Sequence, residues 1–505
     1  MESIKNTKKF KILLILLGIS IFVYAFFPTL ARYKNRTSYY EISEWDGSVA
    51  TKYNSGTGTE IDPYIISNGS EFAYFQSQLE HTDYKGVYFK LGNDIVLNKG
   101  IFSYDGTISY QVDDSIYEIE EYTTNYSEGN INEFPKIKDF KGNLDGNLYR
   151  IYGLYMTSNT ENDLALFDNL SGNISNLYIT NSLIYGGNNT AMLSVDTSDA
   201  TINNVMIDGY VIGSNENMTT TFDITELVDN KINLSNFSYQ GNYVSSKLTG
   251  EFTSTENNKL VINGTEYENG KFEISLNKNT QELSFSLLTE DEYQLNNLKY
   301  VVVSDYGVSS SFAISSNNTN LNNVVNKAYI SAKNYSSGFI HTTSGTLTFK
   351  NGYNTGEIKS NVTSGLINYI NSGNVVIDSF YNNKDLTSSF IYNVSSGDVT
   401  ISNSFTASTS YVIDTVESNV TITNSYAINS DTIKNGEVTG GFTSKDINSL
   451  KNSNFMKETL LFNEFVSIND TLVNNTNIWV FENESYPILY IDDLNRPVAK
   501  INVSI

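Results

Sequence analysis

Apolar and polar residues alternate in four short segments in the second half of the chain. Each segment opens with Gly or Ser, has apolar residues at its third and fifth positions and ends on Tyr or Phe. Alternation with a period of two residues is typical of a β-strand with one buried face, so each segment is predicted to be a strand. The segments are 345–353, 373–381, 397–405 and 418–426, at spacings of 28, 24 and 21 residues.

Short strands at this interval, with Asn, Ser and Gly between them, predict the coils of a parallel β-helix. Each coil buries its apolar face only by stacking on its neighbours, so the core is continuous. An antiparallel sandwich with evenly spaced strands is the alternative, and the fixed register of the pattern favours the β-helix. Asn403 and Asn424 occupy equivalent corners of it and could form a hydrogen-bonded ladder along the axis.

The first half of the chain carries a looser form of the pattern, in which residues 172–179 align with residues 200–207. Two stretches, 71–79 and 444–465, have a helix-like spacing of apolar residues. The bare end of a β-helix offers unpaired strand edges to other molecules. We therefore expect the first helix to cap the N-terminal end of the coils and the second to cap the other end.

Residues 217–315 break the repeat. Within them, 258–276 and 283–287 alternate strand and turn patterns in the manner of a small antiparallel sandwich, for which about 100 residues is a suitable size. The run 262–276 resembles the immunoglobulin-like modules of exported, glycan-active bacterial proteins. We predict a sandwich inserted in a loop of the β-helix.

A second resemblance is carried by the motif Phe-Lys-Gly-Asn-Leu-Asp-Gly-Asn at 140–147, which resembles the signature of bacterial surface β-helix proteins with GLUG-type repeats. The segments 45–66 and 479–489 fit the start and the end of that family, and the resemblance covers about 45–214 and 320–490. Where the family has Gly-rich turns, this chain has mostly Asn and Ser. The resemblance implies a right-handed β-helix, export from a bacterium, and a role in surface adhesion or as a passive scaffold.

The predicted fold is therefore all-β: a right-handed parallel β-helix interrupted by a small antiparallel β-sandwich, with a transmembrane or signal helix at the N-terminus. The expected divisions are a signal peptide or signal-anchor (1–31), a linker (32–44), an N-terminal cap with the first part of the β-helix (45–216), the inserted sandwich (217–315), the second part of the β-helix (316–443) and a C-terminal cap (444–505).

Residues 1–31 have the composition of an export segment. Four lysines precede an apolar run, 12–31, which at about 20 residues is long enough to cross a bilayer. Small residues at 29 and 31 would allow cleavage after Ala31, so a cleaved signal peptide and an uncleaved anchor both stay open, with a buried core helix as a third reading. In the first two cases the chain from Arg32 onward is secreted or lies on the extracellular face of the cell membrane.

Composition then removes several classes of protein. With no Cys there are no disulfides, zinc ribbons or thiol nucleophiles, and two histidines cannot supply a site with three histidine ligands. A net charge of −24 argues against nucleic-acid binding, which needs a basic surface. The 67 Asn residues point to many turns, because Asn tolerates left-handed backbone.

Candidate catalytic residues are few. Asp145 lies near Arg150, but the resemblance makes its Asp-Gly-Asn run a turn between coils. Asp113–Asp114 and Asp492–Asp493 are adjacent pairs in expected loops, and neighbours along a strand point to opposite faces, so we expect solvated surface acids.

His81 and His341 are expected to be structural or surface residues, and most tyrosines to fill the core or turns, although outward Tyr rings can stack on sugars. We assign no catalytic, cofactor-binding or metal-binding residue. Carboxylates and Asn carbonyls are ligands that Ca²⁺ prefers, but the sequence has no recognised calcium-binding loop.

The leading functional hypothesis is a non-enzymatic surface or secreted protein that acts in adhesion or in contact with cell-envelope or host glycans and proteins. It would meet the membrane through residues 12–31 if these are not cleaved. One alternative is a polysaccharide lyase or glycoside hydrolase of the β-helix type, which would need paired carboxylates or a carboxylate cluster with a base. The other alternative is a purely structural spacer.

Overall fold

The computed structural model describes residues 43–102, 108–112, 115–117, 131–158, 162–254, 258–287, 293–429, 431–464, 467–468, 471–472, 478–482 and 484–493. The chain is all-β, with one large parallel sheet and several small antiparallel sheets. The expected membrane segment 12–31 and the pair Asp113–Asp114 lie outside the described residues. Within the described residues, no helix combines the length and the apolar character needed to cross a membrane.

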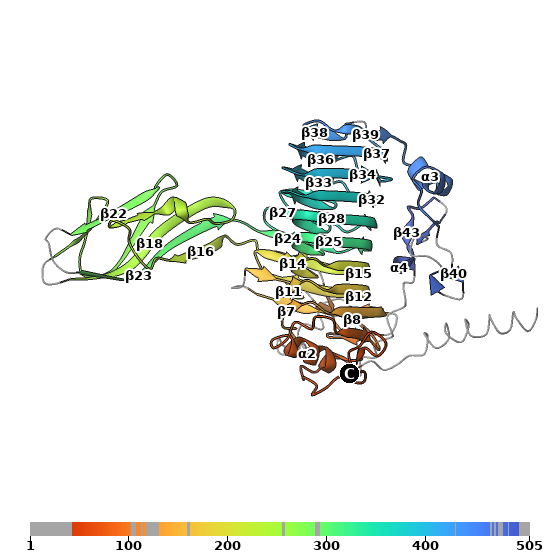
Figure 1. Ribbon diagram of the computed structural model, residues 1–505, viewed down its shortest axis with the longest axis horizontal. Coiled ribbons are helices and arrows are strands. Elements are labelled where there is room, and N and C mark those ends of the chain that lie inside the picture. The colour runs from red at the N-terminus through yellow and green to blue at the C-terminus, as the bar shows by residue number, and fades with distance from the viewer. Residues whose placement is uncertain are drawn as a thin grey trace, which may run out of the picture.

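The large sheet has 28 strands and forms a stack of coils, which we call the coil stack (Figure 1). Each strand pairs in parallel with the equivalent strand one coil later, an arrangement compatible with the expected β-helix. Its first part contains β1 (Tyr64–Ile66), β2 (Tyr88–Leu91), β3 (Ile95–Val96), β7 (Ile137–Phe140), β8 (Asn143–Tyr152), β9 (Tyr155–Thr157), β10 (Asp163–Leu164), β11 (Phe167–Leu170), β12 (Asn173–Tyr185), β13 (Asn189–Ala191), β14 (Ser194–Ser198) and β15 (Thr201–Ile212).

The second part of the coil stack follows the insertion. It contains β24 (Val308–Ser310), β25 (Ala313–Asn326), β26 (Tyr329–Ser331), β27 (Tyr335–Ser337), β28 (Ile340–Asn354), β29 (Ile358–Lys359), β30 (Val362–Ser364), β31 (Ile367–Ile370), β32 (Asn374–Asn382), β33 (Ser388–Val394), β34 (Asp398–Ser402), β35 (Phe405–Thr406), β36 (Tyr411–Val416), β37 (Asn419–Ala427), β38 (Ile433–Asn435) and β39 (Thr439–Ser444).

The four repeat segments stack on one another in register. Leu347 pairs with Val375, and the same position continues through Val399 to Val420. All four side chains belong to a single apolar core that runs the length of the coil stack. The predicted period of two residues therefore places the third and fifth residues of each repeat inside, while the aromatic residue at its end lies in a separate cluster.

The predicted asparagine ladder is confirmed at one corner of the coils. Asn424 Nδ2 donates to Asn403 Oδ1 at 2.7 Å, and both residues have left-handed backbone, with φ of 44° and 47°. Asn tolerates this conformation better than other side chains with a Cβ. The same corner of other coils has Asn176, Asn204, Asn323, Asn351 and Ser379, all with positive φ.

A second asparagine ladder lies inside the protein, at a position that the sequence pattern did not single out. Asn326 Nδ2 donates to Asn354 Oδ1 at 2.6 Å, and Asn354 Nδ2 donates to Asn382 Oδ1 at 2.8 Å. All three residues are fully buried. A primary amide both donates and accepts, so a column of stacked Asn satisfies its own buried polar groups.

The N-terminal end of the coil stack is covered by α2 (Gly69–Gln78), close to the helix expected over 71–79. Asn68 caps the helix by accepting from the Glu71 backbone N–H at 2.9 Å. Phe72 and Phe75 are fully buried in the main core. The helix thus closes the apolar interior at this end.

The insertion forms a separate module with two four-stranded antiparallel sheets, which projects from the coil stack (Figure 1). Its own core includes residues of both sheets, among them Leu248, Phe252 and Phe285. Its strands run from Met218 to Asp305, and Val308 already pairs with Asn189 of the coil stack, whereas the predicted division extends to 315. The elements are β16 (Met218–Asp223), β17 (Lys231–Asn233), η2 (Leu234–Asn236), β18 (Asn242–Ser254), β19 (Leu260–Ile262), β20 (Thr265–Tyr267), β21 (Gly270–Leu276), β22 (Glu282–Leu287) and β23 (Tyr293–Asp305).

The described part of the C-terminal segment lies along the flank of the coil stack, beside several successive coils (Figure 1). We expect an end cap from the sequence, but these contacts are lateral, because the coils present a column of outward apolar and aromatic side chains there. The elements are η3 (Ser449–Lys451), α3 (Ser453–Glu458), β40 (Ser467–Ile468), β41 (Thr471–Leu472), β42 (Trp479–Val480), β43 (Ile488–Leu489) and α4 (Tyr490–Asp493).

A small three-stranded antiparallel sheet follows the first strands of the coil stack. It contains β4 (Ile101–Phe102), β5 (Ile108–Val112) and β6 (Ser115–Tyr117).

Candidate functional site

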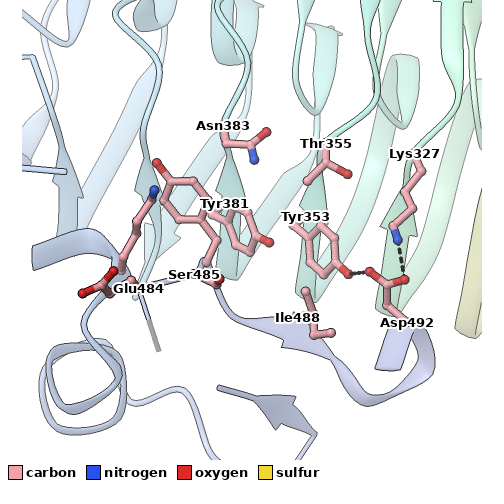
Figure 2. A pocket seen from close by; sticks show the side chains of 11 residues that line it. Lys327, Tyr353, Thr355, Tyr381, Asn383, Glu484, Ser485, Ile488 and Asp492 are labelled. Atoms are coloured by element: carbon pink, nitrogen blue, oxygen red, sulfur yellow. Dashed lines mark hydrogen bonds and ion pairs between the residues drawn. The ribbon is translucent and has the colours of Figure 1, made fainter. Parts of the chain in front are cut away.

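A pocket of about 360 Å³ opens between the flank of the coil stack and the C-terminal segment (Figure 2). We call it the flank pocket. Its coil-stack wall comes from the ends of successive strands, and its other wall comes from the last residue of η3 and the segment that follows. The lining residues are Lys327, Tyr353, Thr355, Tyr381, Asn383, Lys451, Glu484, Ser485, Tyr486, Ile488 and Asp492.

The coil register explains the aromatic wall of the flank pocket. Tyr353 of β28 pairs with Tyr381 of β32, and their rings stack at 4.8 Å with an interplanar angle of 12°. Both rings lie outside the main core, in a second apolar cluster that includes Trp479 and Leu489 of the C-terminal segment. The same position of the repeat therefore places two stacked aromatic rings on the flank, one from each of two successive coils.

Asp492 joins the C-terminal segment to this wall. Its carboxylate accepts from Lys327 Nζ and from the Tyr353 hydroxyl, and the residue is 5 % exposed (Figure 2). The Tyr381 hydroxyl donates to the Pro487 carbonyl at 2.8 Å. The solvated acid expected at 492 is thus a buried anchor, because the flank supplies a cation and a hydroxyl that compensate its desolvation.

The two phenols of the wall are poor acid–base groups. Burial raises the pKa of Tyr353 well above its ordinary value, and the nearby Tyr381 and Asp492 raise it further. Burial likewise raises the pKa of Tyr381, with Asp492 and Tyr486 adding to the effect. Both side chains remain neutral hydrogen-bond donors, so they act in packing and positioning.

A second candidate lies on another face of the coil stack, where Tyr335, Tyr369 and Tyr392 come from successive coils. We call these three residues the tyrosine stripe. The ring centroids of Tyr335 and Tyr369 are 5.4 Å apart, those of Tyr369 and Tyr392 are 5.5 Å apart, and both pairs meet edge to face. All three side chains are partly exposed. Burial raises the pKa of Tyr369, and a hydrogen bond with Tyr335 raises it further.

His341 lies beneath the tyrosine stripe, between Tyr335 and Tyr369 at 5.6 and 5.7 Å from their ring centroids. Its Nδ1 lies 3.0 Å from Asn368 Oδ1, and Asn368 Nδ2 donates to the Ser336 carbonyl, so the neutral His341 donates through Nδ1. Burial lowers the pKa of His341 to about 4, although this hydrogen bond opposes the shift. The geometry is that of a structural histidine.

At its far end the stripe meets a charged pair. Asp414 is buried, and its carboxylate accepts from Lys434 Nζ at 2.6 Å. Burial raises the pKa of Tyr392, and Asp414 raises it further. A carboxylate held in this way neutralises the lysine and leaves the surface of the stripe without net charge from this pair.

The structure disperses the other acids and bases considered in the sequence. Asp145 lies at a coil corner, where its Oδ1 accepts from the Asn147 backbone N–H at 2.8 Å and from Asn176 Nδ2 at 2.9 Å. Arg150 is buried over the ring of Tyr178, at 5.8 Å, and His81 is exposed just after α2. Among the described residues, no three His, Cys, Asp or Glu side chains converge as a metal site would require.

Compared with known proteins, the chain matches no family model, no curated protein sequence and no solved structure. The site residues therefore have to be interpreted from their own geometry. The sequence contains one usable signal for them, since Tyr353 and Tyr381 occupy the same position of the repeat. Nothing comparable marks Asp492, Glu484 or Asn383, which become neighbours only through folding.

Proposed function

We propose that the chain is a non-enzymatic surface or secreted β-helix protein, with the GLUG-type repeats and bacterial origin that the sequence resemblance implies. In this proposal the coil stack binds glycans of a cell envelope or host surface, and the inserted, immunoglobulin-like module serves as a second contact surface. Residues 12–31 would provide a membrane anchor where they are retained. The proposal rests chiefly on the tyrosine stripe.

The stripe suits a sugar chain because of the chemistry of its rings. Tyrosine combines an apolar ring face with a polar hydroxyl, and such side chains are favoured where one surface must contact both apolar and wet groups. Three partly exposed rings from successive coils form a compact cluster, because the centroids of Tyr335 and Tyr392 are also only 6.4 Å apart. A sugar unit with an apolar ring face and surrounding hydroxyls would contact all three.

The enzymatic alternative, a lyase or hydrolase, finds less support at the stripe. A hydrolase of the usual type needs two carboxyl groups on either side of the scissile bond. Here the described acid beside the stripe is Asp414, which is buried against Lys434, and the nearby imidazole of His341 is held by Asn368. Both groups are therefore already held by contacts within the protein.

The test is a glycan array probed with the full chain and with Tyr369→Ala. Removal of the central ring should weaken binding at least about tenfold, which corresponds to about 1.4 kcal/mol. The matched control is Tyr329→Ala, which removes a ring from the Tyr210–Tyr329 pair at 6.0 Å on another face. Equal binding by both variants would contradict the proposal, absence of any bound glycan would favour the spacer, and release of shortened sugars would favour the enzyme.

A further inference from the structure

We propose that the flank pocket is a separate binding site for a neutral, hydroxyl-rich sugar unit, one or two rings in size. The inference rests on the proposed function for its ligand class, but it concerns different residues from the tyrosine stripe. The stripe would contact the exposed face of a sugar, whereas a pocket of about 360 Å³ would enclose a short unit or a chain end. Pockets for small molecules commonly measure about 300–1,000 Å³.

The first observation is an unsatisfied amide on the coil-stack wall. Asn383 Oδ1 is buried and has no hydrogen-bond partner among the residues that the structure describes. Its neighbour Asn382, by contrast, donates to the Lys384 carbonyl and to Ser389 Oγ. A buried acceptor without a partner is destabilising, and such groups are rare away from functional sites. Because this oxygen has no exposed surface, a ligand hydroxyl would meet the Asn383 amide at Nδ2, which Figure 2 shows directed toward Tyr381, and would accept from it.

The second observation is the backbone of Glu484 on the opposite wall. Glu484 has φ of 61°, a left-handed conformation that is strained for a residue with a Cβ. Its exposed side chain lines both the flank pocket and an adjoining hollow of about 660 Å³. Strain of this kind is commonly retained at binding sites, where it holds a side chain in a required direction.

The third observation concerns the ring and the cation beside Glu484. Lys451 Nζ lies over the ring of Tyr486 at 5.2 Å, and Tyr486 lies 5.9 Å from Tyr381. Tyr486 is partly exposed, so its ring offers an apolar surface within a polar pocket. This combination fits the apolar face of a sugar ring together with its surrounding hydroxyls.

The charges of the pocket favour a neutral ligand. Lys327 and Asp492 are already paired with each other. Of the remaining charged lining residues, Lys451 and Glu484 have opposite signs. An anionic ligand would meet Glu484 and a cationic ligand would meet Lys451, whereas a hydroxyl can accept from the lysine or from Asn383 Nδ2 and donate to the carboxylate.

Trp479 provides a direct readout of binding. Its ring lies 6.2 Å from that of Tyr381, and the chain has one other tryptophan, Trp45, at the N-terminal end. In the Trp45→Phe background, the fluorescence of Trp479 is titrated with cellobiose, N,N′-diacetylchitobiose, mannobiose and lactose, and with glucuronic acid and glucosamine as charged probes. We expect a saturable change with at least one neutral disaccharide and a weaker response to both charged sugars.

Two variants test the residues of the pocket. Glu484→Gly removes the carboxylate while allowing the left-handed backbone, and Asn383→Ala removes the amide that lines the pocket. Each should weaken binding at least fivefold, while Glu484→Gly leaves the melting temperature unchanged or raises it. The matched control is Glu482→Gln, an exposed acid of the same segment that does not line the pocket.

Failure of this inference and failure of the proposed function give different results. If none of the neutral disaccharides changes the fluorescence, or if the charged sugars bind more tightly, the inference is overturned, even when the tyrosine stripe still binds the array. If the pocket titrates as expected while Tyr369→Ala leaves array binding intact, the pocket stands and the stripe is overturned.

Discussion

The coil stack and the inserted module are both built from strands, yet they use asparagine in different ways. In the coil stack, Asn403 has left-handed backbone and bonds to Asn424 of the next coil. In the module, Asn263 has the same backbone, with φ of 47°, but its Oδ1 accepts from the Ser284 backbone N–H on a neighbouring antiparallel strand. The same backbone conformation therefore occurs at a corner that repeats along the axis of the coil stack and, in the module, at a single hairpin turn.

The same contrast applies to the cores. The core of the coil stack runs without interruption from Trp45 to Phe442, so each coil depends on the coils beside it. The module has its own core, and its two ends meet, since Met218 pairs with Ser304. The difference teaches that the two regions should unfold as separate units, and the predictions below test this point in order of decreasing effect.

The largest effect is expected from emptying one core at a time. Phe380→Ala removes a fully buried ring that lies 4.8 Å from Phe390 and 5.2 Å from Phe349, and should cost about 3–5 kcal/mol. The matched variant Phe252→Ala removes a fully buried ring of the module. Calorimetry should show that each variant lowers only the transition of its own region. If either variant lowered both unfolding transitions, the coil stack and the module would not unfold as separate units.

Two glycines with similar backbone should differ in their sensitivity. Gly373 has φ of 97°, and a Cβ there would lie 1.7 Å from the Gly345 carbonyl oxygen of the preceding coil. Gly264 of the module has φ of 86° and open space around it. We expect Gly373→Ala to cost about 3 kcal/mol or more and Gly264→Ala about 1–2 kcal/mol, the latter from backbone strain alone. Urea unfolding measures both, and equal costs would show that stacking is not the cause.

Acid should weaken the coil stack through His341. Its pKa of about 4 in the folded protein lies below the ordinary 6.5, so between these values the unfolded chain binds more protons than the folded one. Stability from this group is therefore complete above about pH 6.5 and is lost as pH falls toward 4, by about 3 kcal/mol in all. His341→Gln should flatten this part of the pH dependence in the coil-stack transition. The control His81→Gln, at an exposed position, should leave the pH dependence of this transition unchanged.

The smallest effect is expected from removing the module. Because Met218 and Ser304 are antiparallel partners, Asn-Gly can replace residues 219–303 as a two-residue turn. Met218 and Tyr306 would remain in place over Ala191 and Val308. The coil-stack transition should then stay within about 1 kcal/mol of the original value. A collapse of the coil stack would show that the module stabilises it.

Much of the fold could be predicted because its signals are local and repeated. The alternation around Val375 and Val399 identifies strands with one buried face, and the fixed spacing brings those strands together in parallel. The ladder at Asn403 and Asn424 follows from the same register. The buried ladder through Asn354 was missed, since an Asn inside a core contradicts the ordinary distribution of polar residues until its stacked partners are known.

The candidate sites were less predictable, because they depend on contacts between distant parts of the chain. Alternation continued from Leu347 and Phe349 would place Tyr353 on the core side. The left-handed backbone of Asn351 breaks the alternation, and Tyr353 lies instead in the flank cluster against the C-terminal segment. The hydrogen bond from Tyr353 to Asp492 joins residues 139 positions apart. No local pattern near Asp492 announces that partner, and so the sequence alone suggested a solvated acid.

By itself, the sequence determined the strand period, the stacking register and the asparagine corner, because each of these repeats from coil to coil and needs only local geometry. The tertiary structure alone decided that residues 478–482 and 484–493 lie on the flank, that Asp492 is buried, and that Glu484 and Asn383 line one pocket. The physical reason is that an outward face of a coil is equally compatible with solvent or with a covering segment. Whether a segment covers that face depends on the burial of Trp479 and Leu489 and on the charges and hydroxyls of both surfaces. These groups come together only when the whole chain folds.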